Sequence, residues 1–143
     1  TECVAPFDPP SEEDLRRFGD VIEDRLEEVD RAVPVRDART LVAVAGTSTT
    51  LQACALGLRR YDPDLIHRST LTRTDAERAL GDLAAMTNEE RAAIPVMPKG
   101  RAEVIVAGAS ILVHAMRRFG FEEALVSETD ILDGLAFELL GVR

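Results

Sequence analysis

The stretch of this sequence that is richest in reactive groups is GTSTT at positions 46–50. It follows an apolar run, LVAVA at 41–45, and precedes a short stretch with helical spacing of apolar residues. A turn between a buried strand and a helix presents free backbone N–H groups and the positive helix end to one point, which suits phosphate. No lysine follows, so this is not a Walker loop. We predict a phosphate-binding turn formed by Gly46, Thr47, Ser48 and Thr49, with Thr50 as a further hydroxyl; an ordinary hydroxyl-rich helix cap is the alternative.

A second candidate is Arg101, which precedes the apolar run at 104–113. A cation at the start of a helix opposes the helix dipole, so Arg101 needs an anionic partner, and phosphate would supply one. A surface arginine in a polar loop is the alternative. Gly108 lies inside the apolar run and indicates the close approach of another backbone or a ligand, with packing the simpler explanation.

The remaining candidates carry weaker signals. Glu128 and Asp130 follow the last predicted strand and could hold a hydrated Mg²⁺, although a helix N-cap is the simpler explanation of both. His67 and His114 are isolated from the two cysteines, so we interpret both as structural. No Ser-His-Asp or Cys-His arrangement is present, and no carboxylate is placed to activate water. We therefore assign no catalytic residue and no metal ligand to this chain.

Composition limits the classes of function. The chain has 143 residues, 45% of them hydrophobic, and a formal net charge of −9, which predicts a single packed domain over 1–143. Such acidity argues against nucleic acid and anionic membrane as partners. Residues 34–118 nevertheless carry +3, between −7 over 1–33 and −5 over 119–143, so the middle could attract an anion. Two cysteines, Cys3 and Cys54, fit a reducing compartment, and we expect a cytoplasmic protein.

The hydrophobic pattern alternates strands with helices. We expect a helix that Ser11 caps, strands at 41–45, 67–72 and 124–127, and helices from about 51, 74, 88, 101 and 132. The first strand should be buried on both faces. Capping boxes should open the helices at Thr74 and Thr87, and Gly120 should end the helix from 101. The order predicts an α/β fold that is rich in helices, with a small, mostly parallel sheet. Two or three strands are few for such a sheet, and the chain starts at Thr1 without methionine. We therefore expect a processed chain, a fragment of a longer protein, or a sheet edge that a partner completes.

Several ordered segments together resemble the exopolyphosphatase/guanosine pentaphosphate phosphohydrolase family. They are GTSTTLQA, TDAERALGDLAAMTNEERAAIP, RAEVIVAGASIL and LVSETDILDG, over roughly residues 40–140. The DILDG ending is similar to that of short actinobacterial exopolyphosphatases. Many relatives have Arg-Glu-Gly where this chain has Leu132, Asp133 and Gly134, so one cation of the family is missing here.

The resemblance implies a ribonuclease-H-like fold of the actin and sugar-kinase superfamily. This chain would be the C-terminal part of the second of two domains, without that domain's first strands and without the N-terminal domain. The reaction would be hydrolysis of terminal phosphate from inorganic polyphosphate or guanosine pentaphosphate, assisted by Mg²⁺. The catalytic glutamate and the metal ligands would lie outside this chain, whereas Gly46, Thr47, Ser48 and Arg101 would match phosphate-facing positions.

Two alternatives to a partial hydrolase remain open. One is a non-catalytic α/β module that binds phosphate or regulates a partner. The other is an oligomerising domain, in which a second copy covers the open sheet edge. We expect a homodimer, and we expect the chain alone to be inactive.

Overall fold

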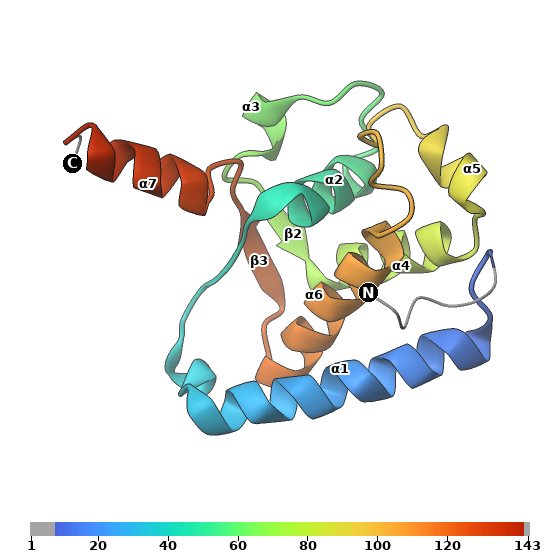
Figure 1. The fold of residues 1–143 in the computed structure, drawn as a ribbon, viewed down its shortest axis with the longest axis horizontal. Helices are drawn as coiled ribbons and strands as arrows, with labels where there is room; N and C mark the ends of the chain where they lie inside the picture. Colours follow the sequence, from blue (N-terminus) through green and yellow to red (C-terminus); the bar gives the residue numbers. More distant parts are fainter. Residues whose placement is uncertain (1–7, 142–143) are drawn as a thin grey trace.

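The computed structural model describes residues 8–141, so Cys3 and the extended N-terminal segment at Pro6 lie outside the described residues. The fold is a helix-rich α/β arrangement in which helices pack on a three-stranded sheet (Figure 1). Its elements are α1 (Glu12–Ala32), η1 (Val35–Asp37), β1 (Leu41–Ala43), α2 (Ala45–Ala55), α3 (Pro63–Ile66), β2 (Thr70–Thr72), α4 (Arg73–Ala84), α5 (Asn88–Ala92), α6 (Ile105–Phe119), β3 (Glu123–Val126) and α7 (Ile131–Leu139).

The sheet is mixed rather than mostly parallel. Its strand order is β1-β3-β2, with β1 parallel and β2 antiparallel to the central β3. Helices α2, α4 and α6 pack together, and α1 crosses α6 and packs against it (Figure 1). The core contains Leu51, Leu71, Ile105 and Val126, which are all fully buried.

Local cap signals explain where several helices begin and end. Ser11 and Asp14 form a capping box at the start of α1, and Thr87 with Glu90 does the same for α5. Gly120 ends α6 with a φ of 77°, a conformation that glycine adopts without penalty. The cap of α4 differs from the expected one: Thr72 accepts from the Asp75 N–H, two residues before the predicted position at Thr74.

The strand at 41–45 was expected to be buried on both faces, and this expectation is wrong. Val42 is 49% exposed, and its register partner on β3, Leu125, is 37% exposed. Ala43 and Ala124 are buried on the opposite face of the sheet, against the helices. The outer face stays open because no described helix packs there, so an uninterrupted apolar run in the sequence was not evidence of two covered faces.

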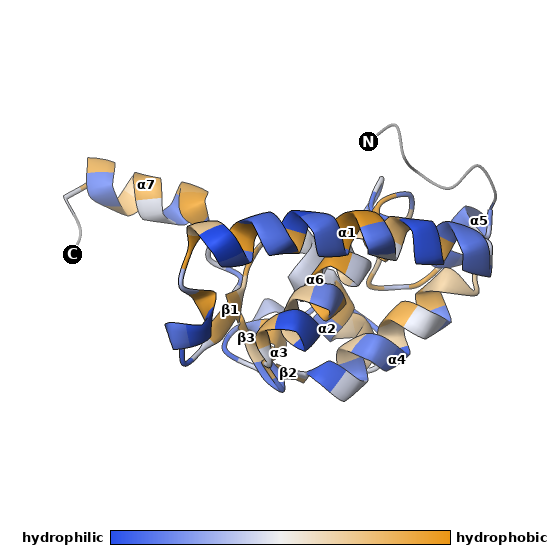
Figure 2. Cartoon of the chain, turned by 90° about the horizontal axis from the view of Figure 1, so that it is seen from below, coloured by the Kyte–Doolittle hydropathy of each residue, from blue (hydrophilic) through white to orange (hydrophobic). Residues whose placement is uncertain are grey.

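The buried face of α6 also differs from the prediction, because helical spacing had placed Val104, Gly108 and Ile111 on that face. In α6 the buried face runs through Ile105, Ala109, Val113 and Met116, whereas Ile111 is 49% exposed. Figure 2 shows α1 with hydrophilic residues over most of its length, and of its residues only Gly19 and Ile22 are buried. None of the described residues of α7 is buried. Of the described helices, none is long and apolar enough to cross a membrane.

Candidate functional site

The GTSTT segment is the beginning of helix α2 rather than a separate turn. The turn from β1 into α2 is made at Ala45, whose φ of 68° lies in the left-handed region. This conformation costs an alanine roughly 1 kcal/mol, and backbone strain of this kind concentrates at functional sites. The sequence analysis predicted this turn at Gly46, one residue later, because glycine is the usual residue for such a turn.

Helix α2 starts without a side-chain cap. Val44 occupies the N-cap position and makes no side-chain hydrogen bond to the helix. The first N–H groups of an α-helix have no acceptor within the helix, and they carry the positive end of its dipole. Ala45 is exposed and Gly46 is half-buried, so solvent reaches this helix end. The geometry leaves donors available to an anion.

Arg101 lies directly on this helix end, although it is 55 positions further along the chain. A Cβ built on Gly46 would lie 2.4 Å from Nη2 of Arg101 and 3.0 Å from its Cζ. Only a glycine therefore lets the guanidinium approach the backbone of α2 this closely. Two positive features, a cation and a helix N-terminus, are held side by side, and an anion bound between them would relieve their repulsion.

The hydroxyl groups of the segment have roles inside the fold. Ser48 Oγ donates to the Val44 carbonyl at 3.1 Å, and Thr49 Oγ1 donates to the Gly46 carbonyl at 3.5 Å. Both residues are buried, and Thr50 is fully buried. The side chain of Thr47 packs on Gly108, where a Cβ would lie 2.6 Å from Thr47 Cγ2. Packing therefore explains the glycine at position 108 of α6, which is the simpler of the two explanations given above.

The site also contains Tyr61, which the sequence analysis missed. Its hydroxyl donates to Glu128 Oε1 at 2.6 Å, across 67 positions of sequence. Burial, and after it the hydrogen bond to Glu128, raises the pKa of Tyr61. Thr49 and Arg101 oppose this rise by smaller amounts, so both residues lie near the phenol. A lone tyrosine in a loop has no motif that could have identified it. The contact joins the segment after β3 to the loop between α2 and α3.

The acidic residues after β3 are occupied by structural contacts. Glu128 accepts from Tyr61, and its backbone N–H donates to His67 Nδ1 at 3.2 Å. Asp130 caps α7 and accepts from the Leu132 N–H at 2.8 Å. Among residues 8–141, no group of three His, Cys, Asp or Glu side chains could hold a metal ion. These acids therefore do not fit a Mg²⁺ site as arranged here.

Both histidines have structural roles, as expected. His67 accepts the Glu128 N–H, and His114 Nδ1 lies 2.6 Å from Glu23 Oε1 on α1. The His114 ring also contacts Gly19, where a Cβ would lie 3.2 Å from Cε1. His114 thus joins α1 to α6.

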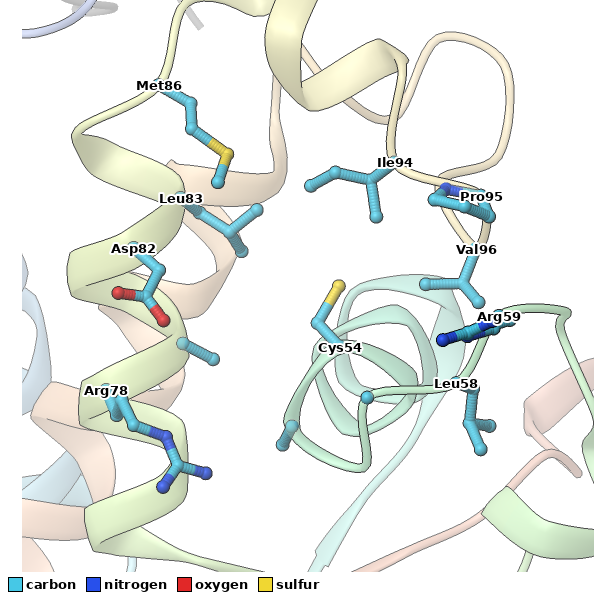
Figure 3. Close-up of a pocket in the computed structure, with 13 residues that line it drawn as sticks. Cys54, Leu58, Arg59, Arg78, Asp82, Leu83, Met86, Ile94, Pro95 and Val96 are labelled. Atoms are coloured by element: carbon cyan, nitrogen blue, oxygen red, sulfur yellow. The ribbon is translucent and has the colours of Figure 1, made fainter.

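A separate cavity of about 350 Å³ lies between the end of α2, α4 and the loop at 94–96 (Figure 3). The residues that line the cavity include Cys54, Leu83, Ile94 and Val96, with Arg78 and Asp82 on the α4 side. Burial raises the pKa of the Cys54 thiol, which makes it a poor nucleophile at neutral pH. The cavity is not part of the helix end that Arg101 contacts.

The comparisons with known proteins agree on one family. The family model described as "Ppx/GppA phosphatase family" matches residues 1–142. Exopolyphosphatase 2 of Mycobacterium tuberculosis is 39% identical over an alignment of 145 residues, which covers 99% of this chain and 46% of that protein. This chain therefore spans about half the length of the relative.

Solved structures show the same fold. The crystal structure of an exopolyphosphatase-like protein superposes with a TM-score of 0.93 at 27% identity, over 97% of this chain and 46% of that one. A Ppx/GppA family member from Aquifex aeolicus superposes with a TM-score of 0.84 at 29% identity, over 99% of this chain and 45% of that one. The ribonuclease-H-like fold class is consistent with these neighbours.

Proposed function

The chain belongs to the Ppx/GppA phosphatase family, and from that premise we propose that it supplies one side of the phosphate site of an exopolyphosphatase. In this proposal, residues 1–143 are the C-terminal portion of a two-domain phosphohydrolase. The substrate is inorganic polyphosphate, with guanosine pentaphosphate as the second candidate. The homodimer and the cytoplasmic location that the sequence predicts stay predictions.

The observation that supports this function is the contact of Arg101 with Gly46 at the uncapped start of α2. Backbone N–H groups and a guanidinium can bind two oxygens of one phosphoryl group. In hydrolysis of a terminal phosphoryl group, negative charge on these oxygens must be stabilised while water attacks. The proposed role of Gly46, Thr47, Ser48, Thr49 and Arg101 is this stabilisation, through backbone donors and one side-chain cation.

The water-activating group and the metal are proposed to lie in the rest of the longer protein. Glu128 and Asp130 are held by Tyr61 and by the cap of α7, so neither is free to orient water at Arg101. Mg²⁺, when bound, would neutralise phosphate charge. We expect the chain alone to release no phosphate from polyphosphate.

Tripolyphosphate titration of the ¹⁵N-labelled chain tests the proposal. The amide signals of Gly46 and Thr47 should shift, and Arg101→Gln should weaken binding about tenfold, because one charged contact to phosphate is lost. Arg16→Gln is the matched control, since Arg16 is exposed on α1 and pairs with Asp20. Equal binding by both variants, or shifts spread evenly over the chain, would contradict the proposed site. Phosphate release by the purified chain would contradict the proposed place of the catalytic group.

A further inference from the structure

Helix α7 exposes an apolar stripe to solvent. It projects from the body of the structure (Figure 1), and none of its described residues is buried. At 3.6 residues per turn, four large side chains share one side of the helix. Their exposed fractions are 84% for Ile131, 70% for Leu132, 52% for Leu135 and 79% for Leu139.

Such a helix needs a surface to pack on. A helix of nine residues is marginal in water by itself, and most helical stability comes from burying an apolar face. Exposed apolar side chains that are contiguous mark an interaction surface more often than scattered ones do. The outer face of the sheet is open as well, at Val42 and Leu125. This side of the chain therefore has the character of an interface.

The start of α7 is fixed to the phosphate-facing end of the fold. Four residues, 127–130, connect β3 to α7, and Glu128 within them binds Tyr61 and His67. Ser127 N–H donates to the Ala43 carbonyl at 2.9 Å, which ties the same segment to β1. A surface that holds α7 would therefore also fix the position of the Arg101 side of the site.

We infer that α7 docks on the part of the longer family protein that this chain does not match, and that this docking sets the two parts of the phosphate site against each other. The inference rests on the proposed function. More than half of each matched relative lies outside the match, so a large surface belongs beside this one. Around the helix, Glu138 lies beside Ile131, whereas Asp130 and Asp133 lie on the opposite side, so the stripe carries no charge of its own and favours an apolar surface. A second copy is the poorer occupant, since residues 119–143 carry −5 and would meet the same charge.

The test uses a chimera in which this chain replaces the matched stretch of M. tuberculosis exopolyphosphatase 2. Hydrogen exchange of α7 amides should slow at least about tenfold in the chimera relative to the chain alone, because docking suppresses local opening. Leu135→Asp should remove this protection. Phe137→Asp is the matched control, because Phe137 is about 200° around the helix from Leu135. Should the chimera not fold, binding of the two parts as separate chains is measured with the same two variants.

The outcomes separate this inference from the proposed function, since neither readout uses phosphate. Equal exchange in the chimera and the chain alone, or equal effects of Leu135→Asp and Phe137→Asp in either format, would overturn the docking of α7. So would light scattering that shows a dimer of the chain which Leu135→Asp dissociates, because the occupant would then be a second copy. Loss of α7 protection in the chimera on Leu135→Asp, with protection kept on Phe137→Asp, would support the docking of α7.

Discussion

The guanidinium of Arg101 lies so close to the α-carbon of Gly46 that a methyl group there would sit 2.4 Å from Nη2. The neighbour in this contact is the far end of a flexible side chain, which can move aside at little cost. Gly46 therefore serves the position of Arg101 more than the stability of α2.

Gly46→Ala should separate binding from stability. Alanine is favourable in a helix, so the free energy of unfolding should change by less than about 1 kcal/mol. Tripolyphosphate affinity should fall about tenfold, because Arg101 is displaced from the helix end. Thermal unfolding and titration measure the two effects.

A double-mutant cycle supplies the control. In an Arg101→Ala background, Gly46→Ala should have almost no further effect on affinity, because the displaced group is already gone. Gly81→Ala in α4 is the matched control, since a Cβ there meets nothing within 4 Å. Additive effects of the two substitutions would show that the contact does not matter for binding.

Ala45→Gly should stabilise the chain. The left-handed φ of 68° at Ala45 carries a steric cost that glycine does not have. We expect a gain of roughly 0.5–1 kcal/mol in the free energy of unfolding, measured by urea denaturation. A loss of stability would mean that the strain is offset by contacts of the alanine methyl group.

Features that depend on neighbouring residues were predicted well from the sequence, whereas features that depend on long-range packing were not. The N-cap at Ser11, the capping box at Thr87 and the stop at Gly120 depend on a few neighbouring residues, and all three are confirmed. The exposure of Val42 depends instead on which elements cover a sheet face, which one strand's sequence cannot specify. The same holds for Tyr61, whose partner is 67 positions away.

The candidate site was predicted in parts. Gly46 and Arg101 were each identified for its own local reason, a turn and a misplaced charge. Their contact across 55 positions is a property of the fold, in which Thr47 on α2 packs against Gly108 on α6. The residue types did not show where the hydroxyl groups point: Ser48 and Thr49 donate to backbone carbonyls at the start of their own helix.

Gly108→Ala should destabilise the chain through Thr47. A methyl group on Gly108 would lie 2.6 Å from Thr47 Cγ2 and 2.7 Å from its Oγ1. Thr47 is β-branched and cannot rotate away freely, so the overlap should cost about 1–3 kcal/mol. Thermal unfolding measures this, and the companion substitution Thr47→Ala should restore more than half of the loss. No rescue would mean that the clash lies elsewhere.

Arg91→Met should be the most destabilising of these substitutions. Arg91 is 4% exposed and donates to the carbonyls of Leu83, Met86 and Ala102, and it pairs with Asp8. Removing the guanidinium leaves these buried acceptors without donors, at a cost of about 3–5 kcal/mol. The control is Arg78→Met, an exposed arginine paired with Asp75, with an expected change below about 1 kcal/mol. Comparable urea midpoints for both variants would contradict this role of Arg91.

The contact of α1 with α6 should make stability depend on pH. The hydrogen bond from His114 to Glu23, opposed in part by burial and aided by Arg118, lowers the pKa of Glu23 below its ordinary 4.5. A carboxylate whose pKa is lower in the folded state stabilises the fold above its unfolded pKa, and this contribution is lost as the pH falls through the folded value.

Glu23→Gln should therefore lower Tm by a few degrees at pH 7, and the difference should vanish as the pH falls below 4.5. Glu28→Gln, on the exposed face of α1 and paired with Arg25, should show no such dependence. A Tm difference for Glu23→Gln that stays constant from pH 7 to acid would mean that its charge does not hold α1 on α6.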